Sequence, residues 1–158
     1  VGRVIFFASS SISSVMFPLV SERLSAGRRY KHLFLYSLLM TFVISSSIAV
    51  FYFTFPQFTL EFFSGFGKSA YLEGAACIGF IGFYYLVFSL CNTFASFFLS
   101  IHKTLAASVL PAGAAILQIV LIGEFHSNVW QIIGSSIVSS VLLLMAFLLY
   151  LFFYDRDR

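Results

Sequence analysis

Apolar residues run along most of this chain in long stretches that short polar segments interrupt. Each stretch reaches the roughly 20 residues that a helix needs to cross a hydrocarbon core about 30 Å thick. Membrane-spanning strands would instead alternate in polarity over about 10 residues, and runs such as "VLLLMAFLLYLFFY" do not alternate. The pattern therefore predicts an all-α, polytopic transmembrane bundle with five spans, at about 2–20, 33–54, 71–100, 104–122 and 129–153.

Composition supports this class of protein. Of the 158 residues, 60% are hydrophobic and only 9% are charged, and the mean hydropathy is +0.99. Ordinary soluble domains carry roughly 25% charged residues. A net charge of +3 comes from nine basic residues spread thinly over the chain, which is not the dense patch that binds nucleic acid. We expect residues 1–158 to form one transmembrane bundle in contact with the lipid bilayer.

The basic residues predict how the bundle is oriented. Seven of the nine lie in alternate connections and the tail, if each stretch crosses the membrane once; Arg3 and Lys68 lie on the other side. The positive-inside rule then places the loop 21–32 and the C-terminus in the cytoplasm, and residue 1 outside. We interpret the first basic cluster as a topology anchor, with contact to lipid headgroups as the alternative. The cluster consists of Arg23, Arg28, Arg29 and Lys31.

The start of the chain is at odds with that orientation. Val1 lies outside at the beginning of a span, and no export signal precedes it. We therefore expect an N-terminally truncated fragment that lacks an odd number of preceding spans.

Serines recur at helical spacing inside two spans. Ser9 and Ser13 are four residues apart, as are Ser135 and Ser139, and each pair has a neighbouring pair one position later, at 10 and 14 and at 136 and 140. Small residues let helices approach closely, and their hydroxyls hydrogen-bond across helices or to their own turn. The faces either pack between helices or form the polar wall of a water-filled pathway, and the sequence leaves both open.

A few other polar or helix-breaking residues lie within the spans. Asn92 and Gln118 lie deep, and we expect them to form interhelical hydrogen bonds or to line a pathway. Pro18 and Pro111 each remove a backbone hydrogen bond, which predicts kinks.

Two ionisable residues lie at the outer edges of spans. Arg3 begins the first span and Glu73 lies near the start of the third. Burying a charge at the bilayer centre costs roughly 2.5–3.5 kcal/mol on insertion scales, so either side chain would extend to the interface. The functional alternative is that they line an outward-opening cavity as substrate-binding residues.

Signatures of enzymes and metal sites are missing from the sequence. His32, His102 and His126 fall in connections on both sides of the membrane without clustered carboxylates, and no zinc-like spacing occurs. Cys77 and Cys91 are about 21 Å apart along one predicted helix, too far for a disulfide. We expect no catalytic residues, no cofactor and no metal.

Three segments of the sequence resemble a known family. "FFASSSISSVMFPLVSERLSAGR" is a small-residue-rich span that ends in a proline, a serine and a charged loop; "FPQFTLEFFSGFGKSAYLEGA" is similar to the next outer loop, and "FLSIHKTLAA" to a short basic turn. Together they resemble the oligosaccharide flippase branch of the multidrug/oligosaccharidyl-lipid/polysaccharide (MOP) exporter superfamily. The region 118–136 departs from the pattern, because that family often shows an asparagine and a Gly-Ala-rich entry to the last span.

The resemblance implies a fold and a function. It makes these spans similar to spans eight to twelve of a MATE-like transporter with two bundles, so that seven spans and the N-terminal bundle of the same chain would be missing. Such proteins move a polyprenyl-diphosphate oligosaccharide across the cytoplasmic membrane by alternating access, for cell-surface polysaccharide biosynthesis. The resemblance implies that Arg3 meets the diphosphate, that the serine faces form walls and that Pro111 is a flexing point.

Two other functions stay open from the sequence alone. A MATE-type exporter of drugs or metabolites would share the fold and would use an acidic group such as Glu73 for a cationic substrate. A non-transporting membrane subunit would need few charges deep in the membrane, as seen here.

Overall fold

The computed structural model describes residues 3–64 and 75–156, which form helices and no strand. Five helices are long and apolar enough to cross a membrane, which confirms the all-α prediction and makes the chain a multi-pass membrane protein. The helices are α1 (Arg3–Ser25), α2 (Lys31–Thr54), α3 (Pro56–Ser64), α4 (Ala75–Ser100), α5 (Thr104–Glu124) and α6 (Val129–Arg156).

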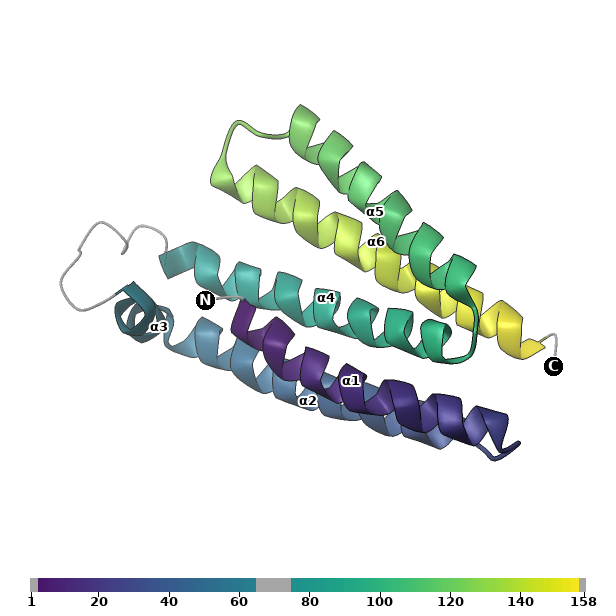
Figure 1. The fold of residues 1–158 in the computed structure, drawn as a ribbon. Coiled ribbons are helices and arrows are strands. Elements are labelled where there is room, and N and C mark those ends of the chain that lie inside the picture. Colours follow the sequence, from purple (N-terminus) through teal and green to yellow (C-terminus); the bar gives the residue numbers. More distant parts are fainter. Residues whose placement is uncertain (1–2, 65–74, 157–158) are drawn as a thin grey trace.

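Helix α4 lies at the centre of the bundle. The α1–α2 hairpin packs on one side of it and the α5–α6 hairpin on the other (Figure 1). Within the described residues, no Cα of one hairpin lies within 8 Å of a Cα of the other. Helices α1, α4 and α6 run in one direction and α2 and α5 in the other. We call the end that holds the α1–α2 loop and the α4–α5 turn the basic end.

Both connections at the basic end close with a residue in the left-handed region. After α1, Gly27 has φ of 64°, and the Arg28 amide donates to the Arg23 carbonyl at 2.9 Å. After α4, His102 has φ of 60°, and the Lys103 amide donates to the Phe98 carbonyl at 2.8 Å. These 6→1 hydrogen bonds are the Schellman closure that ends many helices, and they keep both turns short.

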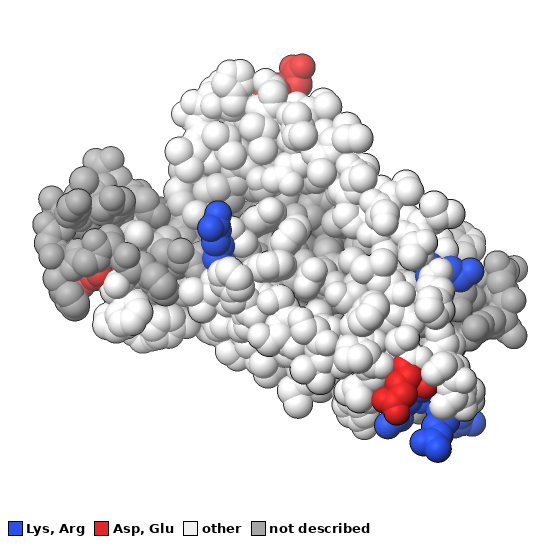
Figure 2. Space-filling model, viewed as in Figure 1, with Lys and Arg blue, Asp and Glu red and all other residues white. Residues whose placement is uncertain are grey.

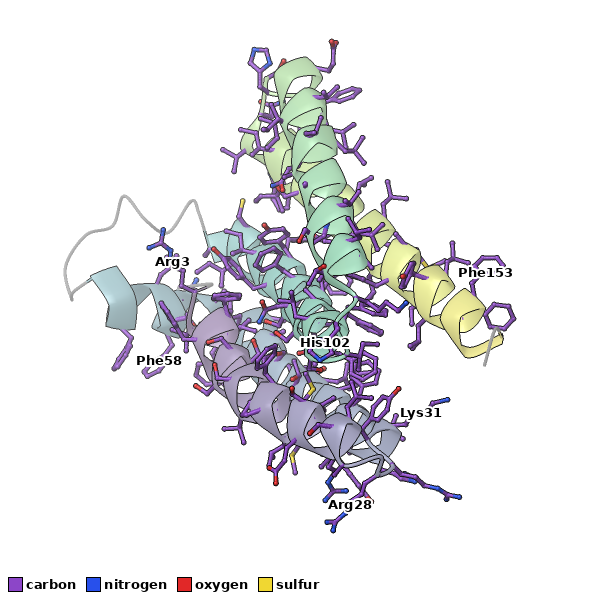
Figure 3. All side chains as sticks on the ribbon, turned by 45° about the vertical axis from the view of Figure 1, so that its right-hand side comes forward. Arg3, Arg28, Lys31, Phe58, His102 and Phe153 are labelled. Atoms are coloured by element: carbon purple, nitrogen blue, oxygen red, sulfur yellow. The ribbon has the colours of Figure 1, made fainter. Side chains whose placement is uncertain are left out.

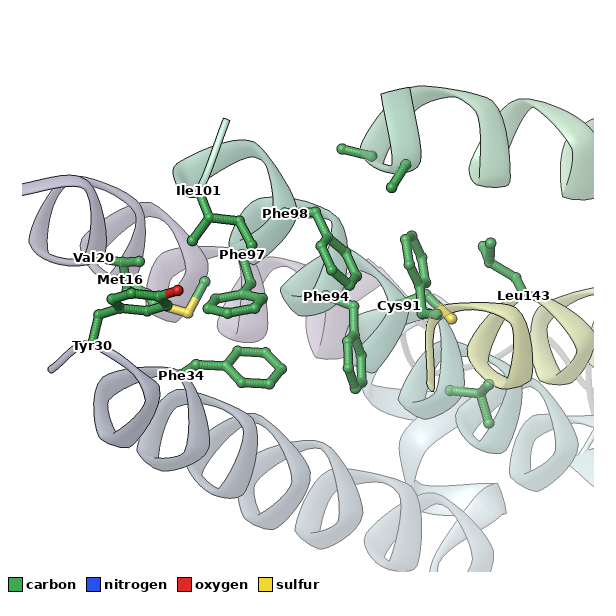
Figure 4. Close-up of a cluster of buried hydrophobic side chains, with 14 residues drawn as sticks. Met16, Val20, Tyr30, Phe34, Cys91, Phe94, Phe97, Phe98, Ile101 and Leu143 are labelled. Carbon is green, nitrogen blue, oxygen red and sulfur yellow. The ribbon is translucent and has the colours of Figure 1, made fainter. Parts of the chain in front are cut away.

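Aromatic rings fill the contacts of α4 near the basic end (Figure 4). Phe97 stacks on Phe34 of α2 with ring centroids 4.0 Å apart, while Phe94 and Phe98 stack on Phe147 of α6 at 5.9 and 5.7 Å. Lipid tails are as apolar as these rings, so the gain on association comes from close packing rather than from removal of water.

Two glycines bring α4 close to α2 nearer the opposite end. A Cβ atom at Gly82 would lie 3.1 Å from the Tyr52 ring and 3.5 Å from the Cα of Ala49, and one at Gly79 would lie 2.5 Å from the Phe53 ring. Tyr52 and Ala49 are themselves buried in a second apolar cluster. The backbone of α4 therefore approaches α2 at a distance that a side chain at Gly82 would prevent.

Helix α3 was not predicted, because its residues were assigned to a loop. Pro56 occupies the first helical position, where its fixed φ favours the helix and its missing N–H costs nothing. Leu60 packs against the second apolar cluster, whereas Phe58 and Phe62 are exposed (Figure 3 labels Phe58). A nine-residue helix of this kind is too short to span a membrane and is amphipathic enough to lie along its surface.

The boundaries of the other helices differ from the predictions by a few residues. α1 continues through the proposed basic loop as far as Ser25, so that Arg23 lies in its last turn. Pro18 and Pro111 lie inside continuous helices, and the kinks predicted there stay predictions. The proposed start of the third span at residue 71 lies outside the described residues.

Charged side chains gather toward the two ends of the molecule, with an uncharged belt between them (Figure 2). Arg23, Arg28, Arg29 and Lys31 lie together at the basic end. Large exposed hydrophobic residues near the middle of the helices, such as Val15 and Ile116, cover the belt. This distribution is the one that a bilayer requires.

Leucine at position 82 is expected to destabilise the bundle by about 1–3 kcal/mol, because overpacking would force α4 away from α2. The matched control is Gly113→Leu, since nothing lies within 4 Å of a Cβ at Gly113. Cys77 and Cys91 are buried in α4, so a fluorogenic maleimide added to heated, detergent-solubilised protein would report unfolding directly. A Gly82→Leu variant that melts at or above the temperature of Gly113→Leu would contradict the close packing of α2 and α4.

Candidate functional site

Six hydroxyl side chains meet where α1, α2 and α4 pack together. All are at most 4% exposed. The Thr93 hydroxyl lies 3.2 Å from that of Thr41 and 3.4 Å from that of Ser13, and it donates to the Ser89 carbonyl at 3.1 Å. We call this set the hydroxyl seam; it consists of Ser9 and Ser13 of α1, Thr41 and Ser45 of α2, and Ser89 and Thr93 of α4.

The hydroxyl seam has two layers, and each layer takes one hydroxyl from α1, one from α2 and one from α4. Thr93 joins the helices in the layer nearer the basic end. One turn farther along, the hydroxyls of Ser45 and Ser89 are buried and have no hydrogen-bond partner within the described part of the chain, while Ser9 donates to its own helix at the Phe6 carbonyl, 2.9 Å away. Ser9 and Ser13 therefore pack between helices and do not line an open path.

A second set of polar contacts joins α5 and α6. The Gln118 amide donates to the Ser136 hydroxyl at 3.1 Å. Ser139 donates to the Ala114 carbonyl at 2.8 Å, and Ser135 is buried nearby in α6. The polar residues predicted in spans four and five thus lie at helix contacts.

The other serine pair of α1 lies on a different side of the helix. Ser14 is exposed and Ser10 is half-buried, and their hydroxyls donate to the carbonyls of Ser10 and Phe7 at 2.9 Å each. Arg3 shares this side, because residues 3, 10 and 14 are spaced by two turns and one turn. The serines of α1 therefore divide between a buried face and an open one.

Ring packing sets which part of α4 lies beside this open side. Phe6 and Phe88 have centroids 5.6 Å apart, and α1 and α4 run in the same direction. Farther along, the Ser13 and Thr93 hydroxyls lie 3.4 Å apart, so the stretch of α1 with Ser10 and Ser14 runs beside the stretch of α4 with Asn92 and Ser96. Asn92 and Ser96 are both half-buried. We call Arg3, Ser10, Ser14, Asn92 and Ser96 the polar face.

Backbone chemistry adds an acceptor to the polar face. Pro18 lies inside α1 and has no N–H, so the carbonyl of Ser14 lacks the hydrogen bond that residue 18 would otherwise donate. In lipid such a carbonyl costs free energy, whereas a polar neighbour or water satisfies it. The proline therefore makes the surroundings of Ser14 more polar than its hydroxyl alone would.

Arg3 lies at the end of α1 that is opposite to Arg28 and Lys31 (Figure 3). Its side chain is exposed. In Figure 2, which has the orientation of Figure 1, the molecular surface is hollowed between α1 and α5. Glu73, which the sequence suggested as a second substrate-binding residue beside Arg3, lies outside the described residues.

The sequence indicates which residues of α1 belong to the polar face, but not which residues of α4 lie beside them. Helical spacing alone relates Arg3, Ser10 and Ser14. Nothing in the sequence relates Ser10 to Asn92, because that relation depends on the tertiary register between α1 and α4.

The basic residues gather at one end of the bundle, and the side of the membrane that this end faces stays a prediction. Arg23, Arg28, Arg29 and Lys31 are exposed around one loop, and Lys103 lies in the neighbouring turn. Among the described residues, no group of three or more His, Cys, Asp or Glu side chains could hold a metal ion.

No protein-family model, curated protein or solved structure matches this chain.

Removing the Thr93 hydroxyl should destabilise the bundle by about 0.6–1.7 kcal/mol, because interhelical hydrogen bonds in membranes contribute about 0.6 kcal/mol on average and about 1.7 kcal/mol at most. Thr93→Val keeps the shape and leaves Ser13 and Thr41 without their shared interhelical partner. Thr54→Val is the matched control, because the exposed Thr54 hydroxyl donates to the Val50 carbonyl of its own helix. Melting temperatures from the maleimide assay measure both.

A triple variant separates hydrogen bonding from packing in the same assay. Replacing Ser13 with Ala and Thr41 with Val in addition to Thr93→Val removes all three hydroxyls, so no buried group is left unpaired in that layer. We expect the triple variant to recover part of the loss. A triple variant less stable than the unmodified protein by the full sum of the three single losses would show that the seam acts through packing alone.

Proposed function

We propose that the chain forms one bundle of an exporter that moves a lipid-linked oligosaccharide across the cytoplasmic membrane. The observation that carries this proposal is the polar face, which lies open on the surface of two membrane-spanning helices. The family resemblance of the α1 segment and the two following loops supports the same conclusion.

The physical argument begins with the cost of polar groups in lipid. A polar group in the hydrocarbon core costs several kcal/mol unless it is hydrogen-bonded. Asn92, Ser96 and the Ser14 carbonyl avoid this cost if they face water or a hydrogen-bonding solute. A sugar presents many hydroxyls, and amide and hydroxyl side chains bind such groups as both donors and acceptors.

The single cation of the polar face supports an anionic headgroup. An arginine binds a phosphate through two parallel hydrogen bonds, which suits a diphosphate. Arg3 lies at the end away from the basic loop, where such a headgroup would enter or leave. No charged residue occurs in the sequence of α4, and α5 has only Glu124, at its end. This wall is therefore better suited to a sugar phosphate than to a cationic drug.

A pathway needs a second wall. We infer that another bundle covers the polar face, and that alternating access arises when the two bundles rock against each other around the substrate. The basic loop would lie in the cytoplasm by the positive-inside rule, so that Arg3 lies near the outer surface.

The test is the reactivity of cysteines placed on the polar face, measured in native membranes. Ser10→Cys and Ser14→Cys should react with a membrane-impermeant methanethiosulfonate at least about tenfold faster than Ser47→Cys. Ser47 is the matched control, because it is an exposed serine of α2 that bonds to its own helix and lies seven residues from the helix end, as Ser10 does. The native Cys77 and Cys91 are buried, so the protein without an introduced cysteine measures the background labelling.

A substrate probe then tests the substrate class. A short-chain polyprenyl-diphosphate disaccharide should slow labelling of the Ser10→Cys variant, and Arg3→Gln should weaken that protection. Equal labelling of Ser10→Cys and Ser47→Cys would refute a water-filled pathway and favour a non-transporting subunit. Fast labelling that the probe does not change would refute the lipid-linked substrate.

A further inference from the structure

The side of α4 away from the polar face is also open, but it is apolar. Within the described residues, no Cα of α2 lies within 8 Å of a Cα of α6, and α4 packs against both helices. The resulting apolar groove has a volume of about 310 Å³. It is lined by residues of α2 between Leu35 and Phe42, by Leu90 and Phe94 of α4, and by Leu144 and Leu148 of α6.

A basic pocket lies beside the groove, at the start of the same helix. It has a volume of about 430 Å³ and is lined by Arg29, Tyr30, Lys31 and His32. Lys31 is one turn before Leu35 on α2, so the two residues lie on the same side of the helix. The basic pocket and the apolar groove therefore follow one another along α2.

The dimensions match one leaflet of a bilayer. From Lys31 to Phe42 is eleven residues, or about 17 Å of helix, and half of a hydrocarbon core is about 15 Å. The groove begins about 6 Å from Lys31 and ends near the bilayer centre. An acyl chain whose headgroup lies at the basic end would extend over the same depth.

Charge at the mouth selects the headgroup. Residues 28–32 hold three cations and no anion. Arg28 and Arg29 are exposed there. Basic residues next to a membrane-spanning helix attract anionic lipids by about 1 kcal/mol each near the surface.

The groove lies on the outer surface of the bundle, and half of the residues that line it are exposed: Leu35, Leu39, Phe42 and Leu148. In a bilayer these side chains meet acyl chains, so a lipid chain is the occupant that the membrane itself supplies.

We propose that this chain holds one anionic glycerophospholipid, with an acyl chain in the groove between α2 and α6 and its phosphate at Arg28, Arg29 and the basic pocket. The site lies on the flank of α4 away from the polar face. The inference does not rest on the proposed function, and a transporter, a subunit or a fragment could each hold such a lipid.

Native mass spectrometry tests the proposal on detergent-purified protein that has been incubated with equal amounts of phosphatidylglycerol and phosphatidylcholine. We expect one phosphatidylglycerol to stay bound, at least about fivefold more often than phosphatidylcholine. Arg28→Gln with Arg29→Gln should abolish that preference, while Arg23→Gln, which changes a charge on α1, should keep it.

A matched pair of tryptophan variants tests the groove itself. Leu39 and Met40 are neighbours on α2 and are both 56% exposed, but only Leu39 lines the groove. Leu39→Trp should reduce retention of phosphatidylglycerol at least about fivefold, and Met40→Trp should not. Neither residue is buried, so both variants should fold, and the maleimide assay checks this.

Three results would overturn the proposal. Equal retention of the two lipids would show that the headgroup is not recognised. Unchanged retention in Leu39→Trp would show that the basic loop acts without the groove. A dimer whose formation Leu39→Trp prevents would show that the groove is a contact between copies of the chain. None of these results affects the labelling of Ser10→Cys, so the two proposals fail separately.

Discussion

Close packing against α4 is the constraint on which the rest of the structure depends. In a bilayer, apolar side chains gain little by leaving lipid, so helices associate only where their surfaces fit or hydrogen-bond. α4 provides each kind of contact in turn: Gly82 beneath Tyr52, the Thr93 hydroxyl between α1 and α2, and Phe98 stacked on Phe147. Among the described residues, no Cα of one hairpin lies within 8 Å of a Cα of the other, so α4 is the helix that holds both in place.

The open flanks of α4 follow from that arrangement, because two hairpins cannot enclose a central helix completely. One flank carries Asn92 and Ser96 beside the open serines of α1; the other carries Leu90 and Phe94 beside leucines of α2 and α6. A surface that only met lipid would have no reason to differ between its sides. The asymmetry is the physical basis for assigning an aqueous pathway to one flank and a lipid to the other.

Hydropathy predicted the five spans because length and polarity alone decide whether a helix crosses a bilayer. It missed α3, whose nine residues give no spanning signal and whose helix depends on Pro56 and on the packing of Leu60. The serine spacing identified two serine faces on α1, but it could not show which face is buried and which is exposed. Only contacts with α4 distinguish Ser13, which meets Thr93, from Ser14, which stays exposed. Tertiary register is therefore the information that this sequence does not carry by itself.

The contacts of α5 differ from those of the other spans and bear on how such a bundle could move. Ala106 and Ala107 are buried against the rest of the bundle at the basic end, but beyond Pro111 every described residue of α5 is half-buried or exposed. In that part, Gln118 and the Ala114 carbonyl provide hydrogen bonds to α6. Pro111 lies at the border between the two parts, where a missing backbone hydrogen bond makes bending least costly. A change of shape that opened the polar face would therefore cost least by movement of α5, with α1, α2 and α4 held together by the hydroxyl seam.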